Sequence, residues 1–325
     1  KQLQLNGSLP KGSKKRYKRS KSSKKNVSEP TQPSPTQQQP EPQVVAAEVI
    51  APEFDVDIAQ EVVFKPNPGP QTNFLSASER EVLYGGAAGG GKSFAMLADP
   101  LHGLNDPNFS GLLVRHTTEE LRELIQKSQE LYPKAIPGIK WSERKSQWIA
   151  PRGGRLWMSY LDKDMDVTRY QGQAFNWIGF DELTQWPTPY AWDYMRSRLR
   201  SAFSSQLGLY MRATTNPGGN GHQWVKKMFI DPSPPNDSFW ATNIETGDTI
   251  KFPKGHSREG QPLFKRRFIP ASLFDNPYLA DSGDYEAMLL SLPEHQRKQL
   301  LEGNWDINEG AAFPEFNRSI HVVEP

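Results

Sequence analysis

The sequence contains no cysteine, which excludes disulfide bonds and thiolate metal sites. Long apolar runs are lacking too. None approaches the roughly 20 residues that a membrane-spanning helix needs, and the polar, basic start has no apolar signal segment. These absences predict a protein with no membrane partner, and the cysteine count fits a reducing cytosol.

Apolar residues are scarce, at 36% of the chain, and the mean hydropathy is −0.70. Residues 1–59 are poorer still in apolar residues, because a basic run is followed there by a stretch rich in proline and glutamine. Such a segment cannot bury enough apolar surface to offset the entropy of ordering. We therefore predict a disordered N-terminal tail.

Acidic residues are missing from residues 1–25, which carry ten lysines and arginines. The rest of the chain holds 29 basic and 37 acidic side chains, so its balance is negative. The tail could bind nucleic-acid phosphates or simply be solvated, and both interpretations stay open. Any DNA contact by the folded part must come from a local basic stripe.

A glycine-rich loop has the full phosphate-loop pattern, G-x-x-x-x-G-K-[ST]. It follows a short apolar run (82–84) and precedes a helical pattern, which is the context that the pattern requires. Lys92 would reach the β- and γ-phosphates of ATP, and the Ser93 hydroxyl would bind Mg²⁺. The alternative is a flexible glycine-alanine loop. The predicted nucleotide-binding residues are Gly86, Ala87, Ala88, Gly89, Gly90, Gly91, Lys92, Ser93 and Phe94.

Two acids follow the apolar run 177–180 and supply what phosphoryl transfer still needs. Asp181 would hold Mg²⁺, and Glu182 would orient and deprotonate the attacking water. Acids often end strands, so the pair is specific only in combination with the phosphate loop. A glutamate after the aspartate favours ATP hydrolysis over binding alone, which makes Glu182 and Lys92 the predicted catalytic residues.

Two further positions are weaker candidates for nucleotide contacts. Gln71 follows a proline-rich lead-in and could read the adenine edge with its amide, or be solvated. Thr214, Thr215 and Asn216 end a predicted strand and could sense the γ-phosphate, or form an ordinary turn.

The order of the predicted elements indicates an α/β fold with a mostly parallel sheet flanked by helices. With the phosphate loop inside this pattern, we predict a P-loop core, followed by a small helical appendix over 284–302 and an extended exit over 313–325. The predicted strands cover 82–84, 111–115, 147–150, 155–161, 176–182, 207–215, a short pair within 239–252, and 267–272. The predicted helices include 119–132, 191–200, 284–292 and 294–302.

Together these landmarks resemble the ATPase domain of the large terminase subunit of tailed bacteriophages, over residues 62–323. The order of Gln71, the phosphate loop, Asp181-Glu182 and the segment 214–217 carries the resemblance, with matches at 275–277 and 303–305. The resemblance implies a motor that uses ATP and Mg²⁺ to translocate double-stranded DNA through the portal into the prohead. It also implies the division of the chain into an ASCE-type P-loop NTPase core over residues 60–270, a small helical lid over 271–312 and a linker over 313–325.

The resemblance also implies partners and a place of action. These are the portal protein, the small terminase subunit and further copies of the chain in a ring, a pentamer by the same resemblance, within the host cytoplasm. It implies a nuclease domain after the linker, and because the sequence stops at Pro325 we expect no nuclease activity.

The phosphate loop departs from some terminases in having no arginine. An arginine from elsewhere, such as a neighbouring subunit, would then act on the transferring phosphate. The resemblance makes Arg169 the first candidate, with Arg198 and Arg200 as alternatives; an ordinary surface ion pair weighs equally for each.

DNA contacts are hard to assign from the sequence. Arg196, Arg198 and Arg200 would spread around a helix, and Lys226 and Lys227 could reach a DNA backbone. Two rival functions remain: another P-loop nucleic-acid motor such as a helicase, which needs a second motor lobe, and an ATP-binding assembly scaffold without turnover. A membrane transporter ATPase is disfavoured, since its Leu-Ser-Gly-Gly-Gln signature does not occur.

Overall fold

The structure is a computed structural model that describes residues 62–201 and 208–306, all within one compact unit, Ala59–Pro325. The predicted disordered tail and the linker lie outside the described residues. In the described part, no helix is long and apolar enough to cross a membrane.

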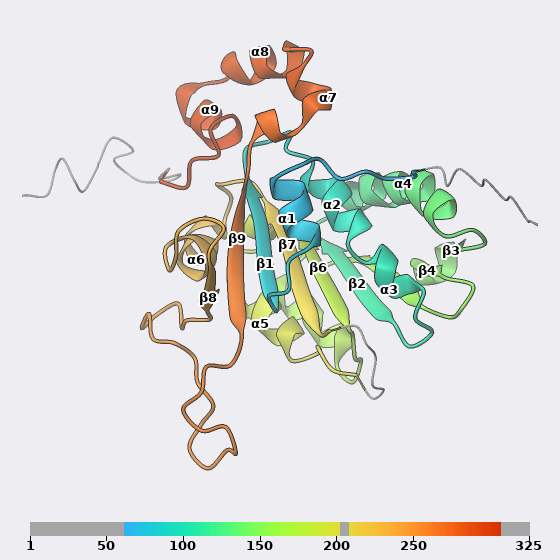
Figure 1. Ribbon diagram of the computed structural model, residues 1–325, viewed down its shortest axis with the longest axis vertical. Helices are drawn as coiled ribbons and strands as arrows, with labels where there is room; N and C mark the ends of the chain where they lie inside the picture. Colours follow the sequence, from blue (N-terminus) through green and yellow to red (C-terminus); the bar gives the residue numbers. More distant parts are fainter. Residues whose placement is uncertain (1–61, 202–207, 307–325) are drawn as a thin grey trace, which may run out of the picture. The chain divides into compact units, whose positions relative to one another are not determined.

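A nine-stranded sheet forms the centre of this unit, in the order β3-β4-β5-β2-β6-β7-β1-β9-β8 (Figure 1). The strands are β1 (Glu81–Gly86), β2 (Ser110–Arg115), β3 (Lys140–Ser142), β4 (Gln147–Ile149), β5 (Arg155–Tyr160), β6 (Trp177–Asp181), β7 (Tyr210–Thr215), β8 (Ser238–Trp240) and β9 (Lys265–Ala271). Six strands that are consecutive in this order run parallel to one another, namely β5, β2, β6, β7, β1 and β9. The strands at both edges pair antiparallel.

Helices cover both faces of the sheet, which confirms the predicted α/β architecture. They are α1 (Pro70–Leu75), α2 (Lys92–Ala98), α3 (Leu101–Leu104), α4 (Thr118–Ala135), α5 (Tyr190–Arg196), α6 (His222–Val225), α7 (Pro277–Ala280), α8 (Asp284–Leu290) and α9 (Glu294–Leu300). Short 3₁₀ turns include η2 (Asp164–Tyr170) and η3 (Leu183–Gln185), and a π-helical turn, η4 (Lys226–Ile230), follows α6.

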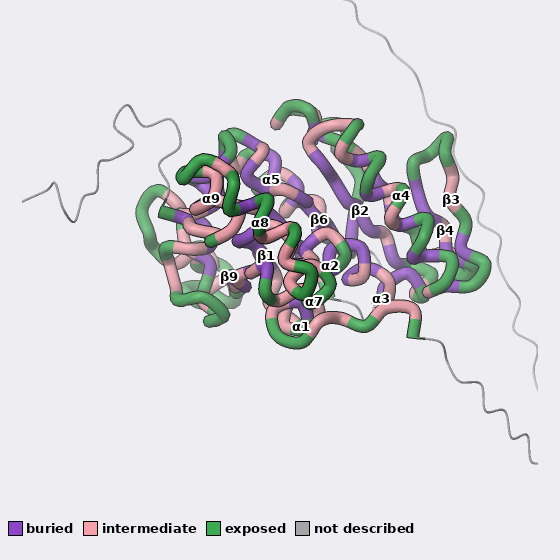
Figure 2. Tube along the Cα trace, turned by 90° about the horizontal axis from the view of Figure 1, so that it is seen from above, coloured by how far each residue is buried: buried purple, intermediate pink, exposed green. Residues whose placement is uncertain are grey.

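Two hydrophobic cores fill the space between the sheet and its helices. On one face, Val82 and Tyr84 of β1 pack with residues of α1, α2 and α4. On the other face, Leu83 packs with the aromatic side chains around η2, α5 and α6. Alternate residues of β1 therefore enter opposite cores, and the strand is buried along its whole length (Figure 2).

The longest helix, α4, begins as its sequence predicts. The Thr117 hydroxyl accepts a hydrogen bond from the Glu120 amide, and the Glu120 carboxylate accepts one from the Thr117 amide. These two backbone N–H groups, which have no carbonyl partner at the start of a helix, are therefore both satisfied.

The prediction of a helix over 191–200 is wrong at its end. Helix α5 ends at Arg196, and the chain then runs beside Phe175, whose amide donates to the Arg198 carbonyl and whose carbonyl accepts from the Arg200 amide. Leu199 forms a parallel bridge with Phe175. Backbone pairing with a distant segment replaces the last helical turn. Arg198 and Arg200 are therefore not helical residues.

The helices α7, α8 and α9 lie together beyond the carboxyl ends of the parallel strands (Figure 1). The division into a core and a lid at residue 271 stays a prediction, although β9 does end at Ala271. A long loop between β8 and β9 projects at the opposite, amino ends of the strands.

Candidate functional site

The phosphate-loop segment joins β1 to α2 and needs its glycines. Gly86 has a φ of 140°, and a Cβ there would lie 2.5 Å from the Ala271 carbonyl oxygen. Gly91, immediately before α2, has a φ of 76°. Side chains at these two positions would be strained or would clash, so the loop's tight path depends on glycine.

Lys92 lies buried beneath this loop, with 6% of its surface exposed. Its ammonium donates to the Ala87 carbonyl and to Asn216 Oδ1, at 2.8 Å from the latter. Burial lowers the pKa of Lys92, and the charges of Glu182 and Asp181 act in the opposite direction. The lysine and the two acids are therefore close enough to interact, as the sequence predicts.

Asp181 ends β6 and is fully buried. Its Oδ1 accepts from the Thr214 hydroxyl, because the two residues face each other in the paired strands β6 and β7. Its Oδ2 lies 2.9 Å from Arg115 Nε, at the end of the other neighbouring strand, β2. The carboxylate thus has one polar partner on each side.

Glu182 adopts a left-handed backbone conformation, with φ 61°, which is costly for a residue with a side chain. Its carboxylate lies 3.3 Å from the Asn216 amide nitrogen and 3.5 Å from the Thr215 hydroxyl. Burial and then the neighbouring Asp181 raise the pKa of Glu182, against the charges of Lys92 and Arg115. Backbone strain and a raised pKa at one acid are typical of functional sites.

Asn216 connects the two halves of the site. Its Oδ1 accepts from Lys92, and its Nδ2 lies 3.5 Å from Glu182 Oε1. Thr184, in the turn after Glu182, shares a hydrogen bond of 2.7 Å with the Thr215 hydroxyl. A change at Lys92 can therefore reach Glu182 through one side chain.

Gln71 lies behind the loop, 3% exposed. Its Nε2 donates to the Gly91 carbonyl at 3.0 Å, and its Oε1 accepts from the Asn67 amide at 2.6 Å. Its amide thus braces the loop, and reading of the adenine edge stays a prediction. Phe94, in the first turn of α2, is 43% exposed.

Among the described residues, the contacts of the predicted arginines are with other groups: Arg198, for example, stacks on Tyr194. Arg169 in η2 pairs with Asp166 at 3.3 Å and stacks on Tyr160, and Arg200 donates to the Gly172 and Gln173 carbonyls. The arginine that contacts the acids is Arg115, which the sequence alone does not identify. It ends a buried strand, but only the strand order places β2 beside β6.

The segment after β9 also contacts the phosphate loop. The Ala88 amide donates to the Leu300 carbonyl at 2.6 Å, and Asn276 Nδ2 donates to the Gly89 carbonyl at 2.7 Å. Gln299 Nε2 donates to the Pro217 carbonyl at 2.7 Å. The helices α7–α9 are thus tied to both the phosphate loop and the turn after Asn216.

A magnesium ion has suitable protein ligands here. Asp181 Oδ2 is a buried oxygen that accepts no hydrogen bond in the described part of the chain, and the Ser93 hydroxyl lies in the first turn of α2. No group of three or more His, Cys, Asp or Glu suited to a metal is found among the described residues. One carboxylate and one hydroxyl fit Mg²⁺, which takes its other ligands from water and phosphates.

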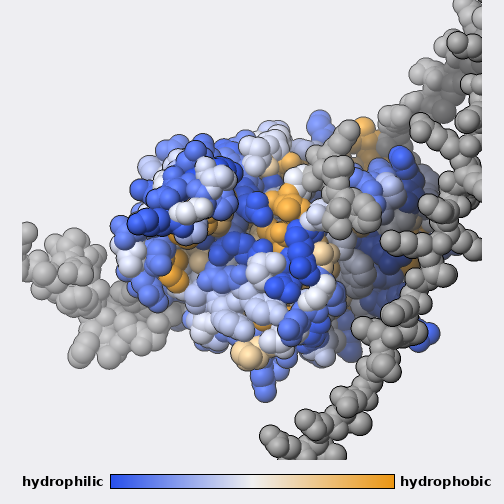
Figure 3. All heavy atoms as spheres, turned by 90° about the horizontal axis from the view of Figure 1, so that it is seen from below, coloured by the Kyte–Doolittle hydropathy of each residue, from blue (hydrophilic) through white to orange (hydrophobic). Residues whose placement is uncertain are grey.

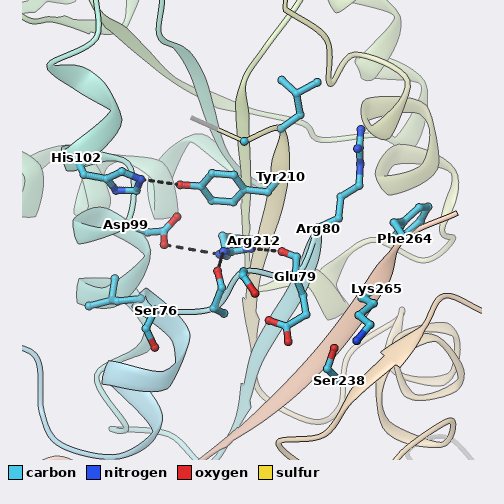
Figure 4. A pocket seen from close by; sticks show the side chains of 15 residues that line it. Ser76, Glu79, Arg80, Asp99, His102, Tyr210, Arg212, Ser238, Phe264 and Lys265 are labelled. Carbon is cyan, nitrogen blue, oxygen red and sulfur yellow. Dashed lines mark hydrogen bonds and ion pairs between the residues drawn. The ribbon is translucent and has the colours of Figure 1, made fainter. Parts of the chain in front are cut away.

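A cavity of about 800 Å³ lies at the other end of the strands (Figure 4). Within it, Asp99 accepts from Trp177 Nε1 and pairs with Arg212, and Tyr210 shares a hydrogen bond with His102. Arg212 also donates to backbone carbonyls of the segment before β1. Most of these groups pair with one another, although Arg212 Nε has no hydrogen-bond partner among the described residues. Because they join α2, β7 and that segment, we assign them a structural role.

Comparisons with known proteins identify the family and the fold of this chain. Residues 83–320 match the family model described as "Terminase large subunit, T4likevirus-type, N-terminal". No curated protein matches the chain.

Among solved structures, a large terminase from a thermophilic bacteriophage in complex with ADP is 14% identical, with a TM-score of 0.52. The match covers 80% of this chain and 58% of that one. Its complex with ATP-γ-S matches at 15% identity, over 80% and 57%, with a TM-score of 0.52.

The Thermus phage P74-26 large terminase ATPase domain is 12% identical, with a TM-score of 0.50, over 74% of this chain and 94% of that one. At these identities the likeness shows the fold, which is the predicted P-loop fold. The family model spans most of the chain, and the chain therefore belongs to the family of T4-like-virus-type large terminase subunits, in their N-terminal region.

Proposed function

We propose that this chain is the ATP-hydrolysing motor domain of a terminase that packages double-stranded DNA. The observation that carries the proposal is the convergence of Lys92, Asp181 and Glu182, with Asn216 in contact with both Lys92 and Glu182. Relatives with the same fold have been solved with ADP and with ATP-γ-S, which supports nucleotide binding.

ATP would bind with its phosphates in the loop 86–93. Lys92 donates to two uncharged oxygens, on Ala87 and Asn216, and a phosphate oxygen is a stronger acceptor because it is charged. Mg²⁺ held by Ser93 and Asp181 would supply charge neutralisation at the phosphates. Lys92 would then leave Asn216, which frees the Asn216 side chain to change its contact with Glu182.

Glu182 would act as the general base for the attacking water. Its raised pKa makes the ionised carboxylate a better proton acceptor, and its strained backbone fixes the carboxylate beside Asn216. Arg169 remains our candidate for the arginine that would act on the transferring phosphate in the site of a neighbouring copy of the chain. Its side chain is 41% exposed and its partner Asp166 lies on its own turn, so another subunit can approach it.

Replacing Glu182 by glutamine tests the proposal. We expect ATP turnover to fall by about 100-fold or more, because the proton acceptor is lost, while binding of an ATP analogue is retained. Glu130→Gln, on the exposed side of α4, is the matched control and should leave turnover unchanged. Equal turnover in Glu182→Gln and the parent would favour an ATP-binding scaffold instead.

The chain spans 58% of the length of the ADP-bound large terminase, so partners belong to the proposal. We propose action on double-stranded DNA, with the portal protein, the small terminase subunit and other copies of the chain in a pentameric ring, in the host cytoplasm without a membrane. DNA-stimulated ATP turnover without strand separation would distinguish this motor from a helicase-like one.

Exposed basic side chains on one loop support DNA contact, although that loop carries three acidic residues beside its three basic ones. The loop 241–264 between β8 and β9 projects at the amino ends of the strands (Figure 1). The molecule seen from that end is mostly hydrophilic, with an apolar region near the centre (Figure 3). Lys251 and Lys254 are exposed on it, and Arg258 stacks on Phe252, at 4.4 Å. By contrast, Lys226 pairs with Asp231 and Asp306.

A further inference from the structure

Arg115 is a buried charge that the proposed reaction does not use. It ends β2, is 8% exposed, and directs Nε to within 2.9 Å of Asp181 Oδ2. Strands β2 and β6 are parallel, with Val114 opposite Phe180. The residues that follow these two therefore extend from the same edge of the sheet, which brings the guanidinium to the carboxylate.

The contact between them is ionic rather than a directed hydrogen bond. Neither Arg115 Nε nor Asp181 Oδ2 has a hydrogen-bond partner among the described residues, despite the short distance. The other carboxylate oxygen is already held by the Thr214 hydroxyl. Arg115 thus neutralises Asp181 through charge, while Thr214 orients it.

The positive charge of Arg115 also interacts electrostatically with three other acids. It acts on Glu182 beside Asp181 and on Glu120 and Glu123 of α4. The guanidinium therefore lies among four carboxylates, of which Asp181 is the one in direct contact. A divalent cation approaching Asp181 would meet this positive charge within a few ångströms, in a buried environment where screening is weak.

We propose that Arg115 is a positioning residue that keeps Asp181 neutralised in the nucleotide-free chain and so prevents a divalent cation from binding there alone. The negative charge of a triphosphate offsets the guanidinium, so cation and nucleotide enter together. This rests on the proposed role of Asp181 as a metal ligand. The consequence is a site that does not fill with metal until ATP arrives.

The test measures Mn²⁺ binding to the nucleotide-free full chain by electron paramagnetic resonance. We expect weak binding by the parent and at least tenfold tighter binding by Arg115→Gln, which removes the charge. Arg115→Lys keeps the charge and should stay within about threefold of the parent. Arg122→Gln, an exposed arginine of α4, is the matched control and should not change Mn²⁺ affinity.

Unchanged or weaker Mn²⁺ binding by folded Arg115→Gln would overturn the proposal, because a purely structural arginine would not repel the cation. If Arg115→Gln does not fold, Arg115→Met decides, because it also removes the charge and keeps an unbranched apolar side chain in the buried site. A gain of at least tenfold in its Mn²⁺ affinity supports the proposal, and parent-like affinity overturns it. The measurement needs no ATP turnover, so it can fail or succeed independently of the Glu182→Gln test.

Discussion

Glu182 combines the demands of chemistry and folding in a single residue. Its φ of 61° belongs to the left-handed region, which costs a residue with a side chain about 1–2 kcal/mol. The turn into η3 requires this conformation, because it carries the chain from β6 toward Thr184. A glycine would adopt this conformation without the steric cost of a side chain, so the glutamate lowers the free energy of unfolding relative to glycine.

Glu182→Gly should therefore raise the free energy of unfolding by about 0.5–1 kcal/mol, the strain relieved minus the greater freedom of glycine when unfolded, while ATP turnover is lost. Chemical denaturation measures the first effect. Ser146→Gly is the control, since Ser146 has a φ of 45° on the surface and should gain stability with turnover intact. A destabilised Glu182→Gly variant would contradict the strain argument.

At the same scale, the sequence predicts the residues of the candidate site but not their contacts. Lys92, Asp181 and Glu182 are predictable because phosphoryl transfer needs those groups after a strand. Arg115 is not, since nothing along the chain says that β2 borders β6. The amide of Gln71 illustrates the same limit: its bond to the Gly91 carbonyl depends on how α1 packs under the loop.

Elements are predictable where local pattern and tertiary structure agree. Short apolar runs predict the parallel strands, and capping residues predict α4. Strand β3, with its exposed Lys140, has too little apolar character to be recognised. The predicted end of α5 is wrong because Phe175, distant in sequence, pairs with the segment after Arg196.

Strand β1 is joined to its neighbours by a buried charge cluster. Glu81 is fully buried and accepts from Arg196 of α5 and, at 2.8 Å, from Arg266 of β9. Burial alone would raise the pKa of Glu81, but the two arginines lower it to about 2. The carboxylate is ionised in the folded chain at pH values where the unfolded chain is protonated.

This cluster makes stability depend on acidity. Because the folded pKa is depressed, its stabilisation is present above the unfolded value of about 4.3 and is lost as pH falls toward 2. Glu81→Gln should cost about 3–5 kcal/mol at pH 7, since two buried arginines lose their partner, and less at pH 3. Unfolding at both pH values measures this, with Glu130→Gln as control. A constant loss at both pH values would contradict the assignment.

At the scale of the described molecule, the nucleotide site and the loop between β8 and β9 lie at opposite ends of the parallel strands (Figure 1). The phosphate loop and the helices α7–α9 lie at the carboxyl ends, and the loop 241–264 projects at the amino ends. The strands β1 and β9 connect the two regions directly, as each runs between them. DNA held by the projecting loop would therefore be linked to the nucleotide site through rigid, buried elements.

The charge balance explains why this loop should matter for DNA. Residues 26–325 carry more acids than bases, so the proposed DNA contact would need a local positive surface. Lys251 and Lys254 are exposed, and no ion pair is found for them in the part of the chain that the structure describes. The loop also carries three acids, Glu245, Asp248 and Glu259, so it is neutral overall and only its exposed lysines offer positive charge. The Glu259 carboxylate accepts from the Gly255 amide at 2.8 Å.

Replacing both lysines by glutamine should weaken DNA binding and lower the slope of log affinity against log salt by about 2, one for each DNA phosphate that a lysine no longer neutralises. Fluorescence anisotropy with duplex DNA at several salt concentrations measures it. Lys140→Gln/Lys145→Gln makes the same charge change at the β3 edge of the sheet, opposite β8, and should leave the slope unchanged. Equal slopes for the two double variants would mean that DNA senses only net charge, and the loop would then have no specific part in gripping it.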